Sequence, residues 1–351
     1  MAKRIIYNSK ITGITAAVPK SVSYIKDYDY FSDIEKSKFI EFVGIHEKRH
    51  VAEGTTAADL CEAAANQLLT ENNINRNEID ALVFVCQTRD YIYPCTSTVL
   101  QHKLKLPKTC LAFDVPLGCS GYIYGITILT ALMESGTVKK GLLLAGDTCT
   151  LSASPKDKTF FPLLGDAGTA TLIEYDKNAE PIYSTMYSDG NGYHDLIMPA
   201  GGFREPWNLD MITEKTGEDG ISRKGYQAYI NGLKIFEFSM REVVKNIRET
   251  IEFAGIDKAE INYFILHQAN KMINETIQKQ LKTEPNKFLN SMYYYGNTGA
   301  ASVPLTIVSQ MKSILNSGKN KLLLSGFGVG LSWASMLLDI NKIKTFDVIE
   351  Y

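Results

Sequence analysis

The stretch "INRNEIDALVFVCQ" at residues 74–87 is matched later in the chain by "IDKAEINYFILHQ" at residues 256–268. Each copy leads from a polar turn into a short β-rich run bounded by polar residues. Ile79 lines up with Ile261, an offset of about 180 residues, and self-similarity at a long, fixed offset is the signature of an internal repeat. The match predicts that the two segments occupy equivalent places in two copies of one unit.

A second pair of segments keeps the same order and nearly the same offset. "KKGLLLAGD" at 139–147 resembles "KNKLLLSGFG" at 319–328, with Leu142 opposite Leu322. Two independent matches at one offset are hard to obtain by chance. A chain of 351 residues also exceeds what a single ordinary core usually serves. The chain is therefore predicted to be a duplicated α/β unit.

Within each copy the pattern alternates between helices and buried strands. Helical apolar spacing marks 56–73 and its longer counterpart 234–255, and short β-rich runs follow both. Strands that alternate with helices predict a mainly parallel sheet covered by helices. We place the two halves at residues 1–180 and 181–351, packed intimately because no Pro/Ser linker separates them. A charged, glycine-rich stretch near 201–225 is expected to be a surface insertion.

Composition indicates a soluble globular protein. Hydrophobic residues make up 45% and charged residues 22%, and a net charge of −2 gives no electrostatic footprint for nucleic acid. The six cysteines form no CxxC pair and no metal-ligand spacing, which favours a reducing compartment. The apolar run at 321–340 contains glycines and serines, so it is interpreted as two buried strands around a turn rather than a membrane span. We expect a cytoplasmic protein that binds no membrane.

A cysteine between glycines, in "DVPLGCSGYIYGI" at 114–126, is the candidate nucleophile. Cys119 follows a strand-like run and precedes a helix-like one, at a turn cleared by Gly118 and Gly121. The positive end of a helix favours thiolate over thiol, which predicts a reactive side chain. The alternative is a small cysteine that fills the core, because free cysteine is among the most buried residue types. The Gly-Cys-Ser-Gly setting favours the nucleophile.

Two polar residues stand at comparable places in the second half. His267 ends the strand-like "INYFILHQ", where side chains emerge at the carboxyl edge of a sheet. Asn297 lies in "YGNTGAASVPL" at 295–305, about 180 residues after Cys119, and both are glycine-flanked starts of a helix. Taken singly, they can equally be a satisfied core histidine and a turn asparagine. Duplication would make both helix starts face one cavity near a pseudo-twofold axis.

Taken together, the motifs "GCSG", "LHQAN" and "GNTGAASVP" resemble those of the thiolase superfamily. The closest similarity is to the ketoacyl-acyl-carrier-protein synthase III type of condensing enzyme. It covers nearly the whole chain, from "VGIHEKRHVA" at 43–52 to "SGFGVGLSWAS" at 325–335. The resemblance implies a duplicated thiolase fold, a layered α/β/α/β/α sandwich of two pseudo-equivalent halves. It also implies a homodimeric acyltransferase of fatty-acid initiation or of a specialised acyl pathway.

The resemblance implies roles for the three residues. In this family the cysteine takes an acyl group from a thioester, and the acyl-enzyme condenses with a malonyl-carrier thioester to give a 3-oxoacyl product. Carried over, Cys119 is the nucleophile, and His267 and Asn297 stabilise the enolate that forms when carbon dioxide leaves. The backbone N–H groups of Cys119 and Val329 would form the oxyanion hole. No metal or other cofactor is implied, because substrates arrive on coenzyme A or on an acyl carrier protein.

Further positions are matched to substrate contacts of the family. The residues that would line the pantetheine channel and the acyl pocket are Asn270, Gly232, Phe236, Phe327, Leu163, Leu164 and Tyr93. Tyr93 would reach across a dimer interface into the acyl pocket of the partner. Lys158 and Lys271 would contact the carrier or its phosphates.

The chain departs from the family pattern where relatives primed by acetyl-coenzyme A hold the adenine. The tryptophan and arginine that sandwich that base in such relatives are replaced here by Lys38 and Phe42, and Met272 stands where an arginine is common. The resemblance therefore predicts that an acyl carrier protein, rather than coenzyme A, delivers the primer. The acyl chain and the pathway stay open.

Three other functions share part of this pattern. The order Cys, His, Asn also occurs in papain-like cysteine proteases, which lack duplicated α/β halves. A non-catalytic partner subunit of another synthase would be expected to lose the cysteine, which is present here. An acyltransferase that passes the acyl group to an alcohol or amine without condensation often replaces the asparagine, so Asn297 favours condensation.

Overall fold

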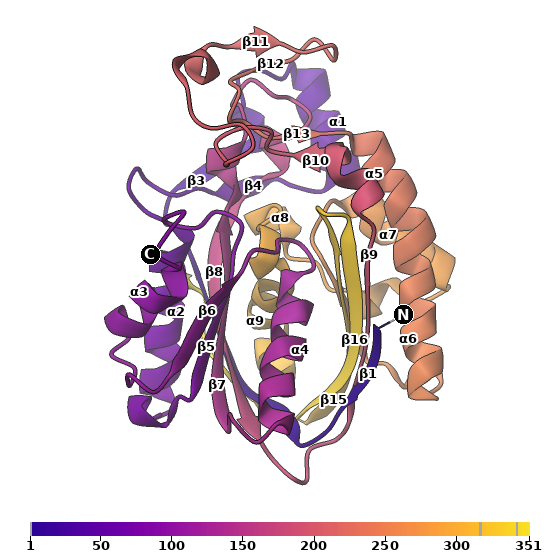
Figure 1. Cartoon of the computed structure of the whole chain (residues 1–351). Coiled ribbons are helices and arrows are strands. Elements are labelled where there is room, and N and C mark those ends of the chain that lie inside the picture. The colour runs from indigo at the N-terminus through magenta and orange to yellow at the C-terminus, as the bar shows by residue number, and fades with distance from the viewer. Residues whose placement is uncertain (1, 316–317, 342) are drawn as a thin grey trace.

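In the computed structural model, which describes residues 2–315, 318–341 and 343–351, two large sheets face each other (Figure 1). The strand order is β17-β2-β8-β7-β5-β6 in the first sheet, with β18 beside β2, and β1-β9-β16-β15-β14 in the second. The strands of the first sheet are β2 (Ser9–Val18), β5 (Ala81–Val85), β6 (Leu111–Val115), β7 (Lys140–Thr148), β8 (Asp166–Tyr175), β17 (Lys344–Thr345) and β18 (Ile349–Glu350). Those of the second are β1 (Ala2–Ile6), β9 (Ile182–Ser188), β14 (Tyr263–Leu266), β15 (Lys319–Gly328) and β16 (Ser332–Asn341).

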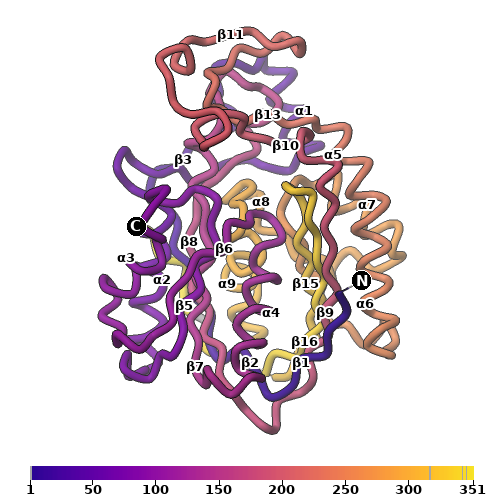
Figure 2. Tube along the Cα trace, viewed as in Figure 1, coloured from indigo at the N-terminus to yellow at the C-terminus, as the bar shows by residue number. Residues whose placement is uncertain are grey.

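Helices form a layer between the sheets and a layer outside each of them. The inner helices α4 (Gly121–Glu134) and α9 (Ser302–Leu315) each contact strands of both sheets, and both begin at the upper end of the view (Figures 1 and 2). The first sheet is covered by α2 (Ala57–Glu71) and α3 (Thr96–Lys103), and the second by α5 (Gly232–Phe238), α6 (Val244–Ala254) and α7 (Lys271–Leu281). The largest cluster of buried apolar residues lies between the sheets, around α4 and α9. The predicted α/β/α/β/α sandwich is confirmed.

The two halves repeat each other in strand order and direction, with registers that differ by one residue. Ala81 of β5 stands opposite Gly141 of β7, and Tyr263 of β14 stands opposite Leu322 of β15. The first sequence match equates Ala81 with Tyr263, whereas the second equates Leu142, one residue after Gly141, with Leu322. The duplication predicted from the sequence is confirmed.

The prediction of a mainly parallel sheet is wrong, because both sheets are mixed. Strand β5 is parallel to β6 and β7, and β14 is parallel to β15, but β8 and β16 run antiparallel to both of their neighbours. Between β15 and β16 the chain turns within three residues, from Gly328 to Ser332, which permits an antiparallel pair without a crossover helix. The apolar run at 321–340 is this pair of strands, as predicted.

The halves exchange their ends. Strand β1, from the start of the chain, pairs with β9 of the second sheet, whereas β17 and β18, from its end, pair with β2 of the first. The expected division near residue 180 falls in the connection between β8 and β9. The two termini accordingly lie on opposite sides of the molecule (Figure 1).

A cap of shorter elements covers the upper end of the sandwich. It consists of α1 (Asp33–Val43), the pair β3 (Val22–Tyr24) and β4 (Glu47–Arg49), the pair β10 (Leu196–Ile197) and β13 (Tyr229–Ile230), the pair β11 (Lys215–Thr216) and β12 (Ser222–Arg223), and α8 (Met292–Tyr295). A capping box at Ser32 starts α1, and a π-helical turn at Ser239–Val243 joins α5 to α6 within the predicted helix 234–255. None of the described helices is long and apolar enough to span a membrane.

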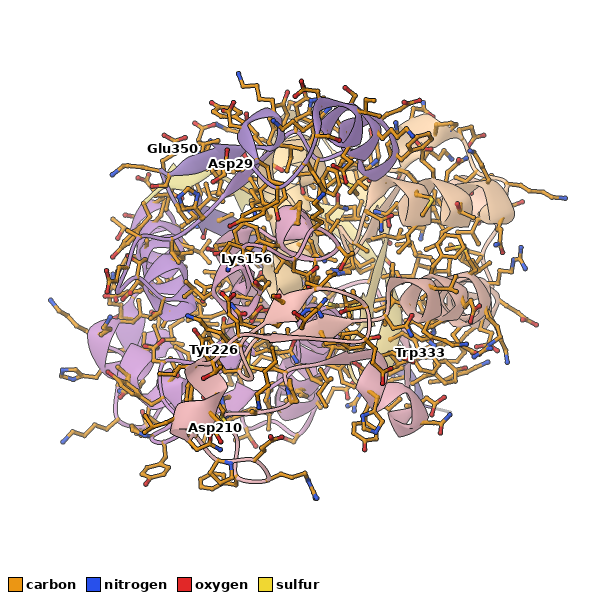
Figure 3. All side chains as sticks on the ribbon, turned by 90° about the horizontal axis from the view of Figure 1, so that it is seen from above. Asp29, Lys156, Asp210, Tyr226, Trp333 and Glu350 are labelled. Atoms are coloured by element: carbon orange, nitrogen blue, oxygen red, sulfur yellow. The ribbon has the colours of Figure 1, made fainter. Side chains whose placement is uncertain are left out.

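The predicted insertion near 201–225 lies at the surface of this cap and is held by ion pairs. Arg223 makes a short ion pair with the buried Asp157, with 2.6 Å between Nη2 and Oδ2, and Lys156 pairs with Glu214 at 2.7 Å. Seen from above, Lys156 lies between Asp29 and Tyr226 (Figure 3). The segment around Lys156 and Asp157 therefore contacts the insertion through these two ion pairs.

Candidate active site

Cys119 lies in the loop from β6 to α4, two residues before the helix begins. The backbone of the second half forms one wall beside it, because a Cβ atom at Gly328 would stand only 2.7 Å from the Cys119 sulphur. Gly328 also has a φ of +155°, a conformation that residues with a side chain rarely adopt. Glycine at this position therefore keeps the space in front of the thiol open.

The thiol of Cys119 is protonated at neutral pH in the free protein. Although the residue keeps some accessible surface, the protein packed around the sulphur raises its pKa to about 11. Hydrogen bonds from the backbone N–H groups of Val329 and Cys119 stabilise the thiolate, whereas the nearby Asp147 carboxylate destabilises it. The prediction of a thiolate-rich cysteine is wrong, because burial outweighs the dipoles at the start of α4. The two N–H groups nevertheless lie beside the sulphur. An oxyanion hole needs donors aimed at the carbonyl oxygen of the reacting acyl group, which would stand next to that sulphur.

His267 follows β14 directly and is only 2% exposed. Its Nδ1 atom lies 2.8 Å from the hydroxyl oxygen of Ser302, the first residue of α9, and its ring packs edge-on against Phe327. Burial lowers the pKa of His267 to about 3, so the imidazole is neutral at physiological pH. A neutral ring whose Nδ1 accepts from the Ser302 hydroxyl carries its proton on Nε2. In that tautomer the ring presents a hydrogen-bond donor.

Asn297 is held between α8 and α9 by backbone contacts with the first half. Its N–H donates to the carbonyl of Leu163 at 2.8 Å, its carbonyl accepts from the N–H of Gly165 at 2.9 Å, and it forms a parallel bridge with Leu164. The Asn297 side-chain oxygen accepts from the N–H of Gly299 at 3.1 Å. Because this bond uses the oxygen, the opposite end of the amide, the Nδ2 donor, can meet a ligand.

The substrate positions expected from the resemblance fall into several groups. Phe327 contacts the His267 ring, and Leu163 and Leu164 hold Asn297, so these three support the site directly. Gly232 begins α5, and the half-buried Phe236 of the same helix packs on the core of the second half. Asn270 caps α7, its side-chain oxygen accepting from the N–H of Ile273.

Three expected contacts lie at the surface, and the two lysines among them have partners on α1. The Lys158 ammonium pairs with Glu35 at 2.9 Å, and that of Lys271 donates to the carbonyl of Glu41 at 3.0 Å, both on α1. Tyr93 is 81% exposed.

Sequence reasoning missed two residues that organise the site. Ser302 lies within "GNTGAASVP" and contacts His267, and Asp147 ends the repeated "KKGLLLAGD" and lies near Cys119. A buried acid at the end of a repeat strand was the available signal for Asp147. Within the described ranges no group of three or more His, Cys, Asp and Glu side chains is placed to hold a metal ion.

The arrangement can be compared with known proteins. Residues 113–190 match the family model "3-Oxoacyl-[acyl-carrier-protein (ACP)] synthase III", and residues 251–340 match the model of its C-terminal part. The chain is 33% identical to a putative 3-oxoacyl-[acyl-carrier-protein] synthase 3 of Campylobacter jejuni, over 98% of this chain and 97% of that protein. It is 28% identical to the β-ketoacyl-[acyl-carrier-protein] synthase III of Lactococcus lactis, over 95% of this chain and 99% of the relative.

Solved structures agree with these matches. A 3-oxoacyl-(acyl-carrier protein) synthase from Burkholderia xenovorans superposes with a TM-score of 0.93 at 32% identity, over 100% of this chain and 99% of that one. A synthase III from Thermus thermophilus gives a TM-score of 0.82 at 27% identity, over 93% and 98% of the two chains. This fold excludes a papain-like protease. The chain therefore belongs to the 3-oxoacyl-acyl-carrier-protein synthase III family of condensing enzymes, within the thiolase superfamily.

Proposed function

We propose that the protein transfers an acyl group from a thioester to Cys119 and then condenses it with a malonyl-carrier thioester. In the first step the sulphur attacks the thioester carbon, the carrier thiol leaves, and the proton of Cys119 passes to it. The backbone N–H groups of Cys119 and Val329 would hold the negative oxygen that forms at the thioester carbon. Since the thiol starts protonated, this step needs the proton to move together with the attack.

In the second step the bond from the malonyl carbon to its carboxylate breaks, and carbon dioxide leaves. The electron pair stays on the malonyl unit as an enolate, whose oxygen would accept from Nε2 of His267 and Nδ2 of Asn297. The enolate carbon then attacks the acyl carbon on Cys119, the carbon–sulphur bond breaks, and the thiolate is released with a 3-oxoacyl thioester as product. No group on the protein has to remove a proton from the malonyl unit.

One observation carries the choice of condensation over transfer to an alcohol or amine. Transfer to such an acceptor needs a base with a pKa near neutrality to take its proton. His267, with a pKa lowered to about 3, is a poor base and a good neutral donor. Decarboxylation supplies its own carbanion and asks only for donors, which is what His267 and Asn297 provide.

The test separates the two half-reactions. Acylation is followed by mass spectrometry of Cys119 with acyl-carrier and acyl-coenzyme A thioesters, and decarboxylation by release of carbon dioxide from malonyl-carrier protein. Replacing His267 or Asn297 with alanine should slow decarboxylation by about a hundredfold or more, the usual effect of losing an oxyanion donor. Acylation should survive in both variants and be lost in Cys119→Ala. Equal loss of both steps in the histidine and asparagine variants would contradict the proposal.

The partners follow from the same proposal. We infer an acyl carrier protein as the donor of the primer, because Lys38 and Phe42 are exposed on α1 and cannot stack an adenine between an indole and a guanidinium. A homodimer in the cytoplasm is proposed as well. The dimer is supported by β6, an edge strand whose Leu111 is 43% exposed, and by the 81% exposure of Tyr93.

A further inference from the structure

Asp147 is a carboxylate at the end of β7, only 2% exposed, to which the steps above give no role. One oxygen, Oδ1, accepts from the backbone N–H groups of Gln87 at 2.8 Å and Thr88 at 3.3 Å, and from the Thr88 hydroxyl at 3.3 Å. The other, Oδ2, accepts from the N–H of Ala300 at 2.9 Å. The first set of donors follows β5 of the first half, whereas Ala300 lies just before α9 of the second. A single carboxylate therefore ties the two halves together at the site.

The Ala300 contact fixes the turn that carries Asn297. Gly299 precedes Ala300 with a φ of +57°, and its N–H donates to the side-chain oxygen of Asn297. A Cβ atom on Gly299 would overlap the Asp147 carboxylate, so this turn is packed directly against the acid. Asp147 thus holds Ala300 and Gly299, and Gly299 in turn holds the amide of Asn297.

We propose that Asp147 is a positioning residue that keeps the Asn297 amide turned with its Nδ2 donor toward the substrate. The inference rests on the proposed enolate contact of Asn297. If the Gly299 N–H moves, the Asn297 side chain loses the hydrogen bond that fixes which end carries the oxygen and which the nitrogen. The amide can then rotate by half a turn. A reversed amide would place its oxygen against the enolate oxygen, where two acceptors repel each other, so the donor would be lost without any change at Asn297 itself.

Asparagine in place of Asp147 is the sharpest perturbation. It has the same shape but one acceptor oxygen instead of two, so it can serve Gln87 and Thr88 or Ala300, and its NH2 group would face an N–H donor on the other side. The variant is expected to fold, because burial already raises the pKa of Asp147 to about 6 and a neutral side chain avoids the burial of a charge. The N–H groups of Gln87 and Thr88 should keep the single side-chain oxygen of the asparagine, so the hydrogen bond to the N–H of Ala300 should be lost.

Asp80 supplies the matched control. It is also a carboxylate that joins β5 to β7, accepting from the N–H groups of Lys139 and Lys140, but at the start of the two strands, at the opposite edge of the sheet. Asp80 is only partly buried, and both N–H groups donate to its Oδ2, which an asparagine oxygen can replace. Asp80→Asn therefore removes a carboxylate between the same two strands without touching Asn297. Differences between the two variants report on the site rather than on the strands.

The experiment is a double-mutant cycle on carbon dioxide release from malonyl-carrier protein, with Asp147→Asn, Asn297→Ala and both together. We expect Asp147→Asn to slow decarboxylation at least about tenfold. Acylation of Cys119 should not be slowed, because loss of the Asp147 charge favours the Cys119 thiolate. In the Asn297→Ala background the same substitution should have almost no further effect, because its route of action is already gone.

The outcomes are distinct. Additive losses, or loss of both half-reactions together, would overturn the positioning role and leave Asp147 a structural residue. Decarboxylation that stays at the parent level in Asp147→Asn would overturn it too, provided that Asn297→Ala still loses activity. If Asn297→Ala itself decarboxylates normally, the proposed function fails first. If Asp147→Asn does not fold, Gly299→Ala perturbs the same turn from its other side. It then takes the place of Asp147→Asn in the double-mutant cycle with Asn297→Ala.

Discussion

Gly328→Ala should close the space in front of the nucleophile. The new Cβ would stand 2.7 Å from the Cys119 sulphur and 2.9 Å from its Cβ, whereas ordinary contacts of this kind lie at 3.4–4 Å. Overpacking of a tight site costs ~1–3 kcal/mol and an unfavourable backbone conformation costs ~1–3 kcal/mol more. A domain with a stability of ~5–15 kcal/mol can carry this and remain folded. The strain should instead displace the thiol.

The effect can be measured before any substrate is known. We expect iodoacetamide to alkylate Cys119 at least about tenfold more slowly in Gly328→Ala. A tenfold change needs only ~1.4 kcal/mol of the strain to add to the activation free energy of alkylation. Peptide mass spectrometry follows the labelling, with the exposed Cys95 as internal reference. Gly202→Ala is the control, because nothing lies within 4 Å of a Cβ at that position. Unchanged labelling of Cys119 in folded Gly328→Ala would refute the packing argument.

Three further predictions concern pH, carriers and assembly. The pKa of His267 is lowered to about 3 from 6.5, so between these values the unfolded chain binds a proton that the folded one does not, and stability falls on acidification. His267→Gln should lose less melting temperature from pH 7 to pH 4 than the parent, and equal losses would contradict this. The same acyl group should be transferred to Cys119 faster from a carrier protein than from coenzyme A. Added salt, or the double substitution Lys158→Glu and Lys271→Glu, should reduce this rate advantage. Faster transfer from the coenzyme A ester would contradict the prediction. Sedimentation should show a dimer, and Tyr93→Ala should change which acyl lengths are accepted; a stable monomer would reject the shared pocket.

The sequence predicted the architecture where the repeat was strong. The offset between the two "LLL" strands placed the starts of α4 and α9 at equivalent points, and with them Cys119 and Asn297. It could not predict that β1 leaves its own half, because strand pairing over such separations depends on which edges are open, not on local pattern. The mixed strand directions depend likewise on turns between strands.

The sequence predicted which residues form the site better than it predicted their protonation states. A helix start was expected to lower the pKa of Cys119, but the amount of protein packed around the sulphur decides the sign, and no local motif reports it. Asp147 has no motif of its own. Its place at the end of a repeated strand could have singled it out, but its role follows only from its oxygens, which accept N–H groups from both halves.

The exchanged ends also bear on how the chain is made. Strand β1 leaves the ribosome about 180 residues before its partner β9, and β2 meets β17 and β18 only after the other strands of both sheets have been synthesised. At translation rates of ~5–20 residues per second, β1 waits on the order of ten seconds or more for β9. Neither half can complete its sheet while the other is still missing, so the nascent protein carries open strand edges until β17 and β18 have been made. The first sheet therefore closes only after residues 344–350 have left the ribosome, and a chaperone that shields such edges would act on a chain that already contains both halves.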